Sequence, residues 1–155
     1  MVVLKYIICA AAAYFIGCLN AAYIYSSKIK NDDIRKYGSG NAGSTNVLRV
    51  YGIKAALPVF LFDTFKGFAV VFLTGLFTNK EVLAEVIAAL FVVCGHNWPF
   101  FMSYRGGKGV AASLGACLAL EPLCGAIALV TAILVIIAFR MVSLGALVGF
   151  VAACI

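Results

Sequence analysis

Residues 55–77 read AALPVFLFDTFKGFAVVFLTGLF, an apolar run whose only charged side chains are Asp63 and Lys66. About 20 mostly apolar residues are enough for a helix to cross the hydrocarbon core of a bilayer. This run therefore predicts a membrane-spanning helix. The rest of the chain agrees, because 65% of its 155 residues are hydrophobic and only 12% are charged. A soluble domain has roughly half apolar and a quarter charged residues, so the composition indicates a membrane protein.

Apolar runs on both sides of this segment predict further helices. Residues 2–25 and 82–98 are each long enough to cross a bilayer. Residues 110–120 and 123–139 are apolar too, and an acidic residue and a proline separate them. These two runs form either one broken span or two helices that turn back at the break, and we favour two helices. The last run, residues 144–155, is too short to cross. We expect an all-α polytopic helical bundle of about five to six helices.

Basic residues gather in the loops that would share one side of the membrane. The chain has 12 Lys and Arg against 6 Asp and Glu. Cytoplasmic loops carry an excess of Lys and Arg, so these loops are predicted to be cytoplasmic and the N-terminus to lie outside. A net charge of +6 would suggest nucleic-acid binding in a soluble protein. Membrane orientation explains it here, and we expect no nucleic-acid partner. The residues assigned to the cytoplasmic side are Lys28, Lys30, Arg35, Lys36, Arg49, Lys54, Arg105, Lys108 and Arg140.

The first of these loops contains the sequence GSGNAGSTN at residues 38–46, followed by Arg49. Glycines permit tight turns and let backbone amides approach an anion, while hydroxyl, amide and guanidinium groups supply donors. The pattern is typical of a phosphate-binding loop, although a flexible interhelical connection would also explain it. The spacing matches neither a Walker loop nor a Rossmann fingerprint. The candidate binding residues besides Arg49 are Gly38, Ser39, Gly40, Asn41, Gly43, Thr45 and Asn46.

A second glycine-rich loop follows His96 and contains Arg105, Gly106, Gly107, Lys108 and Gly109. Glycines between two cations suit an oxyanion, and the flexible stem of the lysine could reach a phosphate. The histidine either orients substrate or moves a proton, or it closes a helix end by hydrogen bonding to a carbonyl. We expect this loop to bind a second anionic group on the same face.

Three further residues have two possible roles. Asp63 and Lys66 are three residues apart in a predicted span, where an isolated charge would cost about 2.5 to 3.5 kcal/mol on insertion scales. They are predicted to pair, and the pair either supports the nearby loop or acts in the site directly. Ser143, after Arg140, is either a helix N-cap or a site residue beside the two loops.

Four stretches resemble the bacterial acyl-phosphate:glycerol-3-phosphate acyltransferases of the PlsY type. They are DIR at 33–35, GSGNAGSTNVLR at 38–49, DTFKG at 63–67 and GHNWPFFMSYRGGKGVA at 95–111. The resemblance runs from about residue 15 to Leu144 and implies a seven-helix arrangement in a single membrane domain, here residues 1–155. The family transfers a fatty acyl group from acyl phosphate to the 1-hydroxyl of sn-glycerol 3-phosphate, giving lysophosphatidate in the first acylation step of phospholipid synthesis.

The resemblance also implies roles for particular residues. It assigns Ser39, Arg49 and Lys108 to the substrate phosphates, makes His96 a site residue with the Gly106–Gly107 turn, and puts Ser143 near the donor phosphate. Leu144 and Ala146 depart from the second small hydroxyl that many members have there. The family's last helix and third motif lie beyond the end of this chain, so we expect the enzyme to continue past Ile155.

The expected mechanism is direct attack of the glycerol hydroxyl on the acyl carbonyl, without an acyl-enzyme. His96 has no aspartate five residues later, so the HxxxxD acid–base pair of acyl-CoA-type enzymes is missing. The family suggests that a substrate phosphate takes the proton. We expect no metal or cofactor, and a monomer in the bacterial cytoplasmic (inner) membrane. The alternative is a small transporter of phosphate-type anions, because glycine-rich breaks and intramembrane charges also bind transported substrates.

Overall fold

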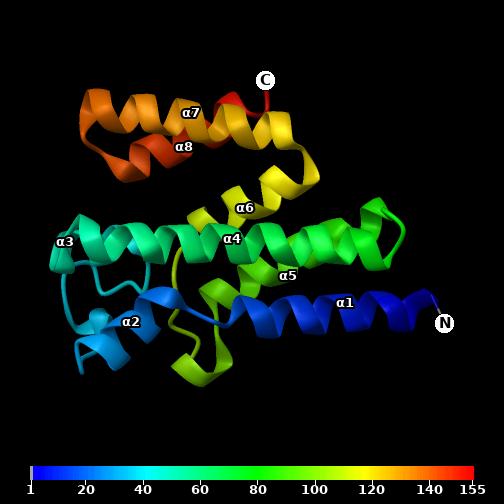
Figure 1. The fold of residues 1–155 in the computed structure, drawn as a ribbon, viewed down its shortest axis with the longest axis horizontal. Coiled ribbons are helices and arrows are strands. Elements are labelled where there is room, and N and C mark those ends of the chain that lie inside the picture. The colour runs from blue at the N-terminus through cyan, green and yellow to red at the C-terminus, as the bar shows by residue number, and fades with distance from the viewer. Residues whose placement is uncertain (1) are drawn as a thin grey trace.

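The computed structural model describes residues 2–155, and every regular element in that range is a helix. This confirms the predicted all-α membrane fold (Figure 1). In chain order the elements are α1 (Val2–Gly17), α2 (Ala21–Ile29), the 3-10 turn η1 (Ile34–Lys36), α3 (Ser44–Tyr51), α4 (Ile53–Phe77), α5 (Val82–Asn97), the 3-10 turn η2 (Phe100–Met102), α6 (Val110–Leu120), α7 (Pro122–Phe139) and α8 (Val142–Ala152).

Four segments of the described chain are long and apolar enough to cross a membrane: Val3–Ile29, Ile53–Phe77, Val82–Met102 and Pro122–Phe139. They include the three predicted spans and the predicted later crossing. The expectation of two helices between residues 110 and 139 is also confirmed. α6 ends at Leu120, and α7 begins at Pro122 and runs back over α6 and α4 (Figure 1). Proline suits the first helical position because the amide it lacks has no intrahelical partner there.

The first predicted span is not one continuous helix, which corrects the expectation for residues 2–25. α1 ends at Gly17 and α2 begins at Ala21. The side chain of Asn20 accepts a hydrogen bond from the Tyr23 backbone N–H at 2.9 Å, and so caps α2. An asparagine side chain that accepts from an unpaired amide at a helix start favours a new helix over continuation of the previous one. Gly17 and Asn20 are the local signs of this break, but they stand within a mostly apolar run.

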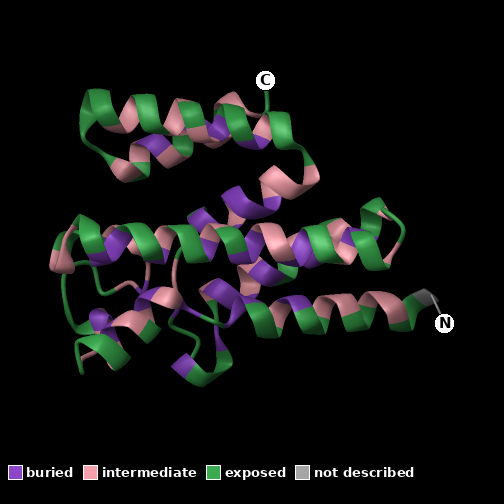
Figure 2. Ribbon diagram, viewed as in Figure 1, coloured by how far each residue is buried: buried purple, intermediate pink, exposed green. Residues whose placement is uncertain are grey.

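The long helix α4 forms the centre of the bundle and packs against α3, α5 and α6, while α1 packs against α5. Burial concentrates where α4, α5 and α6 meet, and exposed residues dominate the outer faces of α1 and α7 (Figure 2). Small residues allow close contacts: Gly67 of α4 faces Ala112 of α6, and Gly115 of α6 faces Thr64 of α4. Small residues at helix contacts are typical of membrane bundles, where lipid removes the hydrophobic drive for association.

The final two helices, α7 and α8, form a hairpin at one side of the bundle (Figure 1). Gly145 and Gly149 of α8 lie directly against Ala132 and Ala128 of α7. The connection between the two helices is short, because α7 ends at Phe139 and α8 begins at Val142. This hairpin brings the start of α8 to the same end of the bundle as α3 (Figure 1).

Candidate active site

The first turns of three helices, α3, α6 and α8, line one cavity of about 370 Å³. Its walls consist of Ser39, Asn41, Gly43, Ser44, Thr45, Asn46, Arg49, Lys108, Val110, Val142, Ser143, Ala146, Leu147 and Phe150. The residues before these helices are Gly43, Gly109 and Met141, and none of them makes a side-chain cap hydrogen bond. The first amides of a helix have no intrahelical partner and carry the positive end of its dipole. Three such ends make the cavity favourable for an anion.

The charged residues of this cavity have one sign. Arg49 and Lys108 line it, and its described walls contain no carboxylate. The hydroxyls of Ser39, Thr45 and Ser143 add neutral donors. Three segments that are far apart in the sequence therefore meet here: the first glycine loop, the end of the second, and the start of α8. An uncompensated pair of cations with several hydroxyls suits a phosphate group.

A smaller cavity of about 280 Å³ adjoins the first and adds Arg140 to the site. Arg49, Thr45, Val142 and Ser143 line both cavities. Arg140 directly follows the last residue of α7 and has a left-handed backbone conformation, with φ of 54°. Sequence reasoning assigned this arginine only to membrane orientation. Its position three residues before Ser143 was the available signal, but the shared cavity depends on the turn between α7 and α8.

An apolar cavity of about 260 Å³ also adjoins the first one. Every residue that lines it is hydrophobic: Phe60, Val110, Leu114, Ala128, Leu129, Ala132, Ile133, Ile136, Val142, Ala146 and Phe150. Four of these residues, Val110, Val142, Ala146 and Phe150, also line the cationic cavity. A polar anion site therefore adjoins a hydrocarbon-like space between α4, α6, α7 and α8.

The first glycine loop is held in shape by the buried side chain of Asn46, at the start of α3. Its Oδ1 accepts a hydrogen bond from the Ser39 backbone N–H at 2.9 Å, and its Nδ2 donates to the carbonyls of Ile34 at 3.2 Å and Tyr37 at 3.0 Å. Its amide is therefore already used within the loop, and its expected role in phosphate binding stays a prediction. Gly38 has φ of 58°, and a β-carbon there would overlap the Asn46 side chain.

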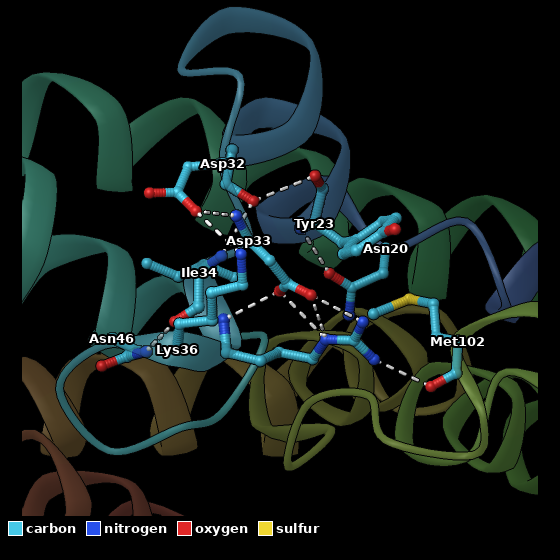
Figure 3. A network of polar contacts seen from close by, with 10 residues as sticks. Asn20, Tyr23, Asp32, Asp33, Ile34, Lys36, Asn46 and Met102 are labelled. Carbon is cyan, nitrogen blue, oxygen red and sulfur yellow. Dashed lines mark hydrogen bonds and ion pairs between the residues drawn. The ribbon is translucent and has the colours of Figure 1, made fainter.

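Arg35 connects the segment before this loop to the segment before the second loop, because it bonds to both Asp33 and Met102, which Figure 3 labels. Its guanidinium donates to Asp33 Oδ2 at 2.7 Å and to the Met102 carbonyl at 2.8 Å, and it lies 5.0 Å from the Tyr23 ring centre. The side-chain hydrogen bonds from Arg35 hold the pKa of Asp33 below its usual range. Asp33 also accepts from the Arg35 backbone N–H at 3.0 Å and so caps η1. The two loops are therefore fixed to each other.

The second loop does not present its central glycine amides to the cavity. The Gly106 N–H donates to the Asn97 carbonyl at 3.0 Å, and the Gly107 N–H donates to the His96 carbonyl at 3.0 Å. The Gly106 carbonyl accepts from the Ala42 N–H at 3.3 Å. These glycines pack the two loops together, and the predicted role of Gly106 and Gly107 in anion binding stays a prediction. Gly109 precedes α6, and Lys108 alone of this loop's residues reaches the cavity wall before α6 begins.

His96 does not line the cavity but lies buried behind it. Its Nδ1 is 3.1 Å from Lys66 Nζ and 3.5 Å from Asp63 Oδ1. A β-carbon on Gly107 would overlap His96 Nε2 and approach the Ala42 carbonyl oxygen within 2.9 Å, so only glycine fits between the loops. The imidazole thus contacts both the charged pair and the underside of the loops. Its predicted direct role in catalysis remains a prediction.

The predicted pairing of Asp63 with Lys66 is confirmed, at 3.0 Å between Oδ1 and Nζ. Both residues are buried, with 1% and 4% of their surfaces exposed. Lys66 also donates to the backbone carbonyls of Gly17 at 3.1 Å and Leu19 at 2.7 Å. The pair therefore does more than neutralise itself, because it reaches the break between α1 and α2.

Ser143 is the second residue of α8, and the residue before that helix is Met141. The alternative role of Ser143 as an N-cap is therefore not seen, and its side chain lines both cationic cavities. Among the described residues, no three His, Cys, Asp or Glu side chains are grouped in a way that could hold a metal ion.

Comparison with known proteins gives a consistent result. A family model described as glycerol-3-phosphate acyltransferase matches residues 7–155. A glycerol-3-phosphate acyltransferase of Thermoanaerobacter sp. (strain X514) is 51% identical over 145 residues, which cover 94% of this chain and 72% of the relative. The glycerol-3-phosphate acyltransferase of Clostridioides difficile (strain 630) is 46% identical over 153 residues, covering 96% and 75%.

Two crystal structures of PlsY, an integral membrane glycerol 3-phosphate acyltransferase, resemble the fold. The glycerol 3-phosphate form has a TM-score of 0.88 at 30% identity and covers 96% of this chain and 74% of PlsY. The lysophosphatidic acid form has a TM-score of 0.84 at 30% identity, with coverage of 96% and 73%.

Proposed function

The chain belongs to the glycerol-3-phosphate acyltransferase family, and from this membership we propose that it acylates glycerol 3-phosphate, with acyl phosphate as the donor. The product is lysophosphatidate, and inorganic phosphate is released. The reaction takes place on a multi-pass membrane protein whose glycine loops face the cytoplasm and whose N-terminus lies outside. In a bacterium this is the cytoplasmic membrane. The working unit is a monomer.

The observation that supports this proposal most strongly is the adjacency of the cationic and apolar cavities. Each substrate carries a phosphate, and one of them also carries a fatty acyl chain. The cationic cavity and its extension contain Arg49, Lys108 and Arg140, which suit two phosphates. The apolar cavity shares four wall residues with the first one, so a donor can extend its chain there while its phosphate stays among the cations.

The proposed step is a single acyl transfer. The glycerol 1-hydroxyl oxygen attacks the acyl carbonyl carbon, the bond from that carbon to the phosphate oxygen breaks, and inorganic phosphate leaves. The hydroxyl proton passes to a phosphate oxygen of a substrate. An acyl phosphate is already activated, so positioning and charge stabilisation supply the catalysis and no acyl-enzyme is needed.

The roles of individual residues follow from their places in the cavities. Lys108 and the Ser39 hydroxyl hold the donor phosphate, and Arg49 lies between the two compartments and contacts both phosphates. Ser143 lies near the donor phosphate, and Thr45 orients the acceptor in the shared wall. The donor's leaving phosphate gains negative charge as the bond breaks. The cations and the ends of α3, α6 and α8 then stabilise that charge.

The decisive experiment uses the purified full-length protein in lipid vesicles with acyl phosphate and labelled glycerol 3-phosphate. We expect lysophosphatidate and inorganic phosphate in equal amounts, with no acylated protein trapped by rapid quenching. Acyl-CoA as the only donor should give no product. If no product forms while labelled anion crosses the vesicle wall, the protein is a transporter. A trapped acyl-enzyme would overturn the single-step mechanism.

His96 offers a separate test of the mechanism. His96→Ala in the same full-length protein should alter turnover through the position of the loops, with binding affected too. Near-total loss of turnover at unchanged affinity for both substrates would instead favour a histidine base.

A further inference from the structure

We infer that Lys66 is a positioning residue for the acyl-transfer site, and that its buried ammonium fixes both glycine loops through two separate chains of contacts. The inference rests on the proposed function, because its test measures acyl transfer. Lys66 lies in α4 and does not line any of the three cavities described above. Its effect on the reaction must therefore pass through the residues that it holds.

The first chain runs through the break in the first membrane segment. Lys66 Nζ donates to the carbonyl of Gly17, the last residue of α1, and to that of Leu19 in the break. The last carbonyls of a helix have no intrahelical donor, and inside a membrane bundle water does not replace it. The ammonium group, which belongs to α4, thus stabilises the break between α1 and α2. A continuous helix would use these carbonyls itself, so the break and the lysine depend on each other.

The break places Asn20 at the first glycine loop. Asn20 is fully buried, and its Nδ2 donates to the Ala42 carbonyl at 2.9 Å, while its Oδ1 caps α2. Ala42 lies between Asn41 and Gly43, which line the cationic cavity. Lys66 therefore controls the position of the first loop through the backbone of residues 17–19 and one asparagine.

The second chain runs through His96. Lys66 Nζ lies 3.1 Å from His96 Nδ1, and the opposite edge of the imidazole packs against Gly107 without room for a β-carbon. The next residue, Lys108, lines the cavity. The two chains then meet, because the Ala42 N–H donates to the Gly106 carbonyl. One ammonium group thus sets the separation of the loops that carry the phosphate-binding groups.

A lysine suits this place better than a neutral residue. Three oxygens accept hydrogen bonds from Nζ within 3.1 Å, two from backbone carbonyls and one from the Asp63 carboxylate, and the His96 ring nitrogen lies 3.1 Å away. Only a group with several donors on a long stem can serve them together. Asp63 balances the charge, which makes burial in the bundle tolerable.

The test replaces the pair by neutral residues of similar size. Lys66→Met alone would leave the buried Asp63 without its lysine partner and would destabilise the protein, so the main variant is Asp63→Asn with Lys66→Met. We expect it to remain folded, and its kcat/KM to fall about 100-fold, since a displacement of about 1 Å in a site costs that much. The matched control is Lys5→Met with Glu81→Gln. That pair also connects α1 to another segment, but it lies about 18 Å further along α1 at 1.5 Å per residue. The control should keep wild-type kcat/KM.

A double-mutant cycle separates positioning from a purely structural role. Asn20→Ser keeps a capping oxygen but is too short to reach Ala42. If Lys66 acts through Asn20, adding Asn20→Ser to the neutral-pair variant should lower kcat/KM by less than the product of the two separate losses. Strictly multiplicative losses, or a neutral-pair variant with wild-type kcat/KM per folded molecule, would overturn the inference. An inactive wild-type protein would instead refute the proposed function.

Discussion

Replacing Gly67 of α4 by alanine should disable the site from outside it. A β-carbon at Gly67 would overlap the Ala112 carbonyl oxygen and come within 2.9 Å of the Ala112 carbonyl carbon. Carbon atoms in favourable contact are about 3.5–4.0 Å apart, so α4 and α6 would have to separate by about 1 Å. Ala112 lies in the first turn of α6. The separation would therefore move that turn, together with the preceding Lys108, away from the cavity.

The size of the effect follows from that displacement. A shift of about 1 Å in a catalytic arrangement costs about 100-fold in rate, and overpacking costs about 1–3 kcal/mol of folding free energy. We expect kcat/KM of Gly67→Ala to fall about 100-fold in lipid vesicles. Its midpoint of thermal unfolding should also fall. The enzyme should remain a helical membrane protein by circular dichroism, because alanine favours a helix more than glycine does.

Gly75→Ala supplies the matched control, because it makes the same chemical change in the same helix. A β-carbon there would meet the carboxyl end of Glu85, whose flexible side chain can move away, and would lie 3.4 Å from Lys80 Cδ. We expect near wild-type kcat/KM for this variant. Wild-type kcat/KM for Gly67→Ala, or an equal loss in Gly75→Ala, would contradict the displacement of α6.

Arg140→Met should raise KM for glycerol 3-phosphate about 10- to 100-fold, because a charge-assisted hydrogen bond contributes about 1.5–3 kcal/mol. Arg105→Met should leave KM unchanged, because it removes a cation that lines neither cationic cavity. Equal effects of the two variants in steady-state kinetics would contradict this. The ion pair with Arg35 lowers the pKa of Asp33 from its ordinary 3.8, so it stabilises the fold above that pH and is lost as the pH falls through the lowered pKa. The thermal midpoint of Asp33→Asn should therefore lie below the wild-type midpoint at neutral pH and converge with it in strong acid, and a constant gap would argue against the pair. Ala146 lines both the cationic and the apolar cavity, so a phenylalanine there would occupy part of the apolar space. The preference measured as kcat/KM for donors of different length should therefore shift toward short acyl chains. An unchanged preference would exclude this cavity as the acyl site.

Local patterns in the sequence were sufficient for most of the helices. Length and hydropathy identify α4, α5 and α7, because an uninterrupted apolar run has few other stable forms in lipid. The proline after Glu121 indicated the turn between α6 and α7. The spacing of Asp63 and Lys66 on one helix face predicted their pairing. None of these inferences needed a contact with a distant part of the chain.

The break in the first membrane segment was different. Residues 2–25 are mostly apolar, and Asn20 is a single polar residue late in this run. The break is stable because a lysine 49 residues away satisfies the Gly17 carbonyl. A donor supplied by another helix leaves no trace in the local sequence.

Hydropathy and residue types specify an all-helical membrane protein with two glycine-rich, basic loops suited to phosphate. Which groups of those loops face the cavity depends on how the helices pack. Asn46, Gly106 and Gly107 use their polar groups to hold the loops, whereas Arg140 joins Arg49 beside the cavity. The physical reason is that hydropathy and residue type act locally, while the direction of an amide or guanidinium depends on the packing of helices distant in the chain. The site exists where α3, α6 and α8 begin together, and helix packing alone brings those three starts to one place.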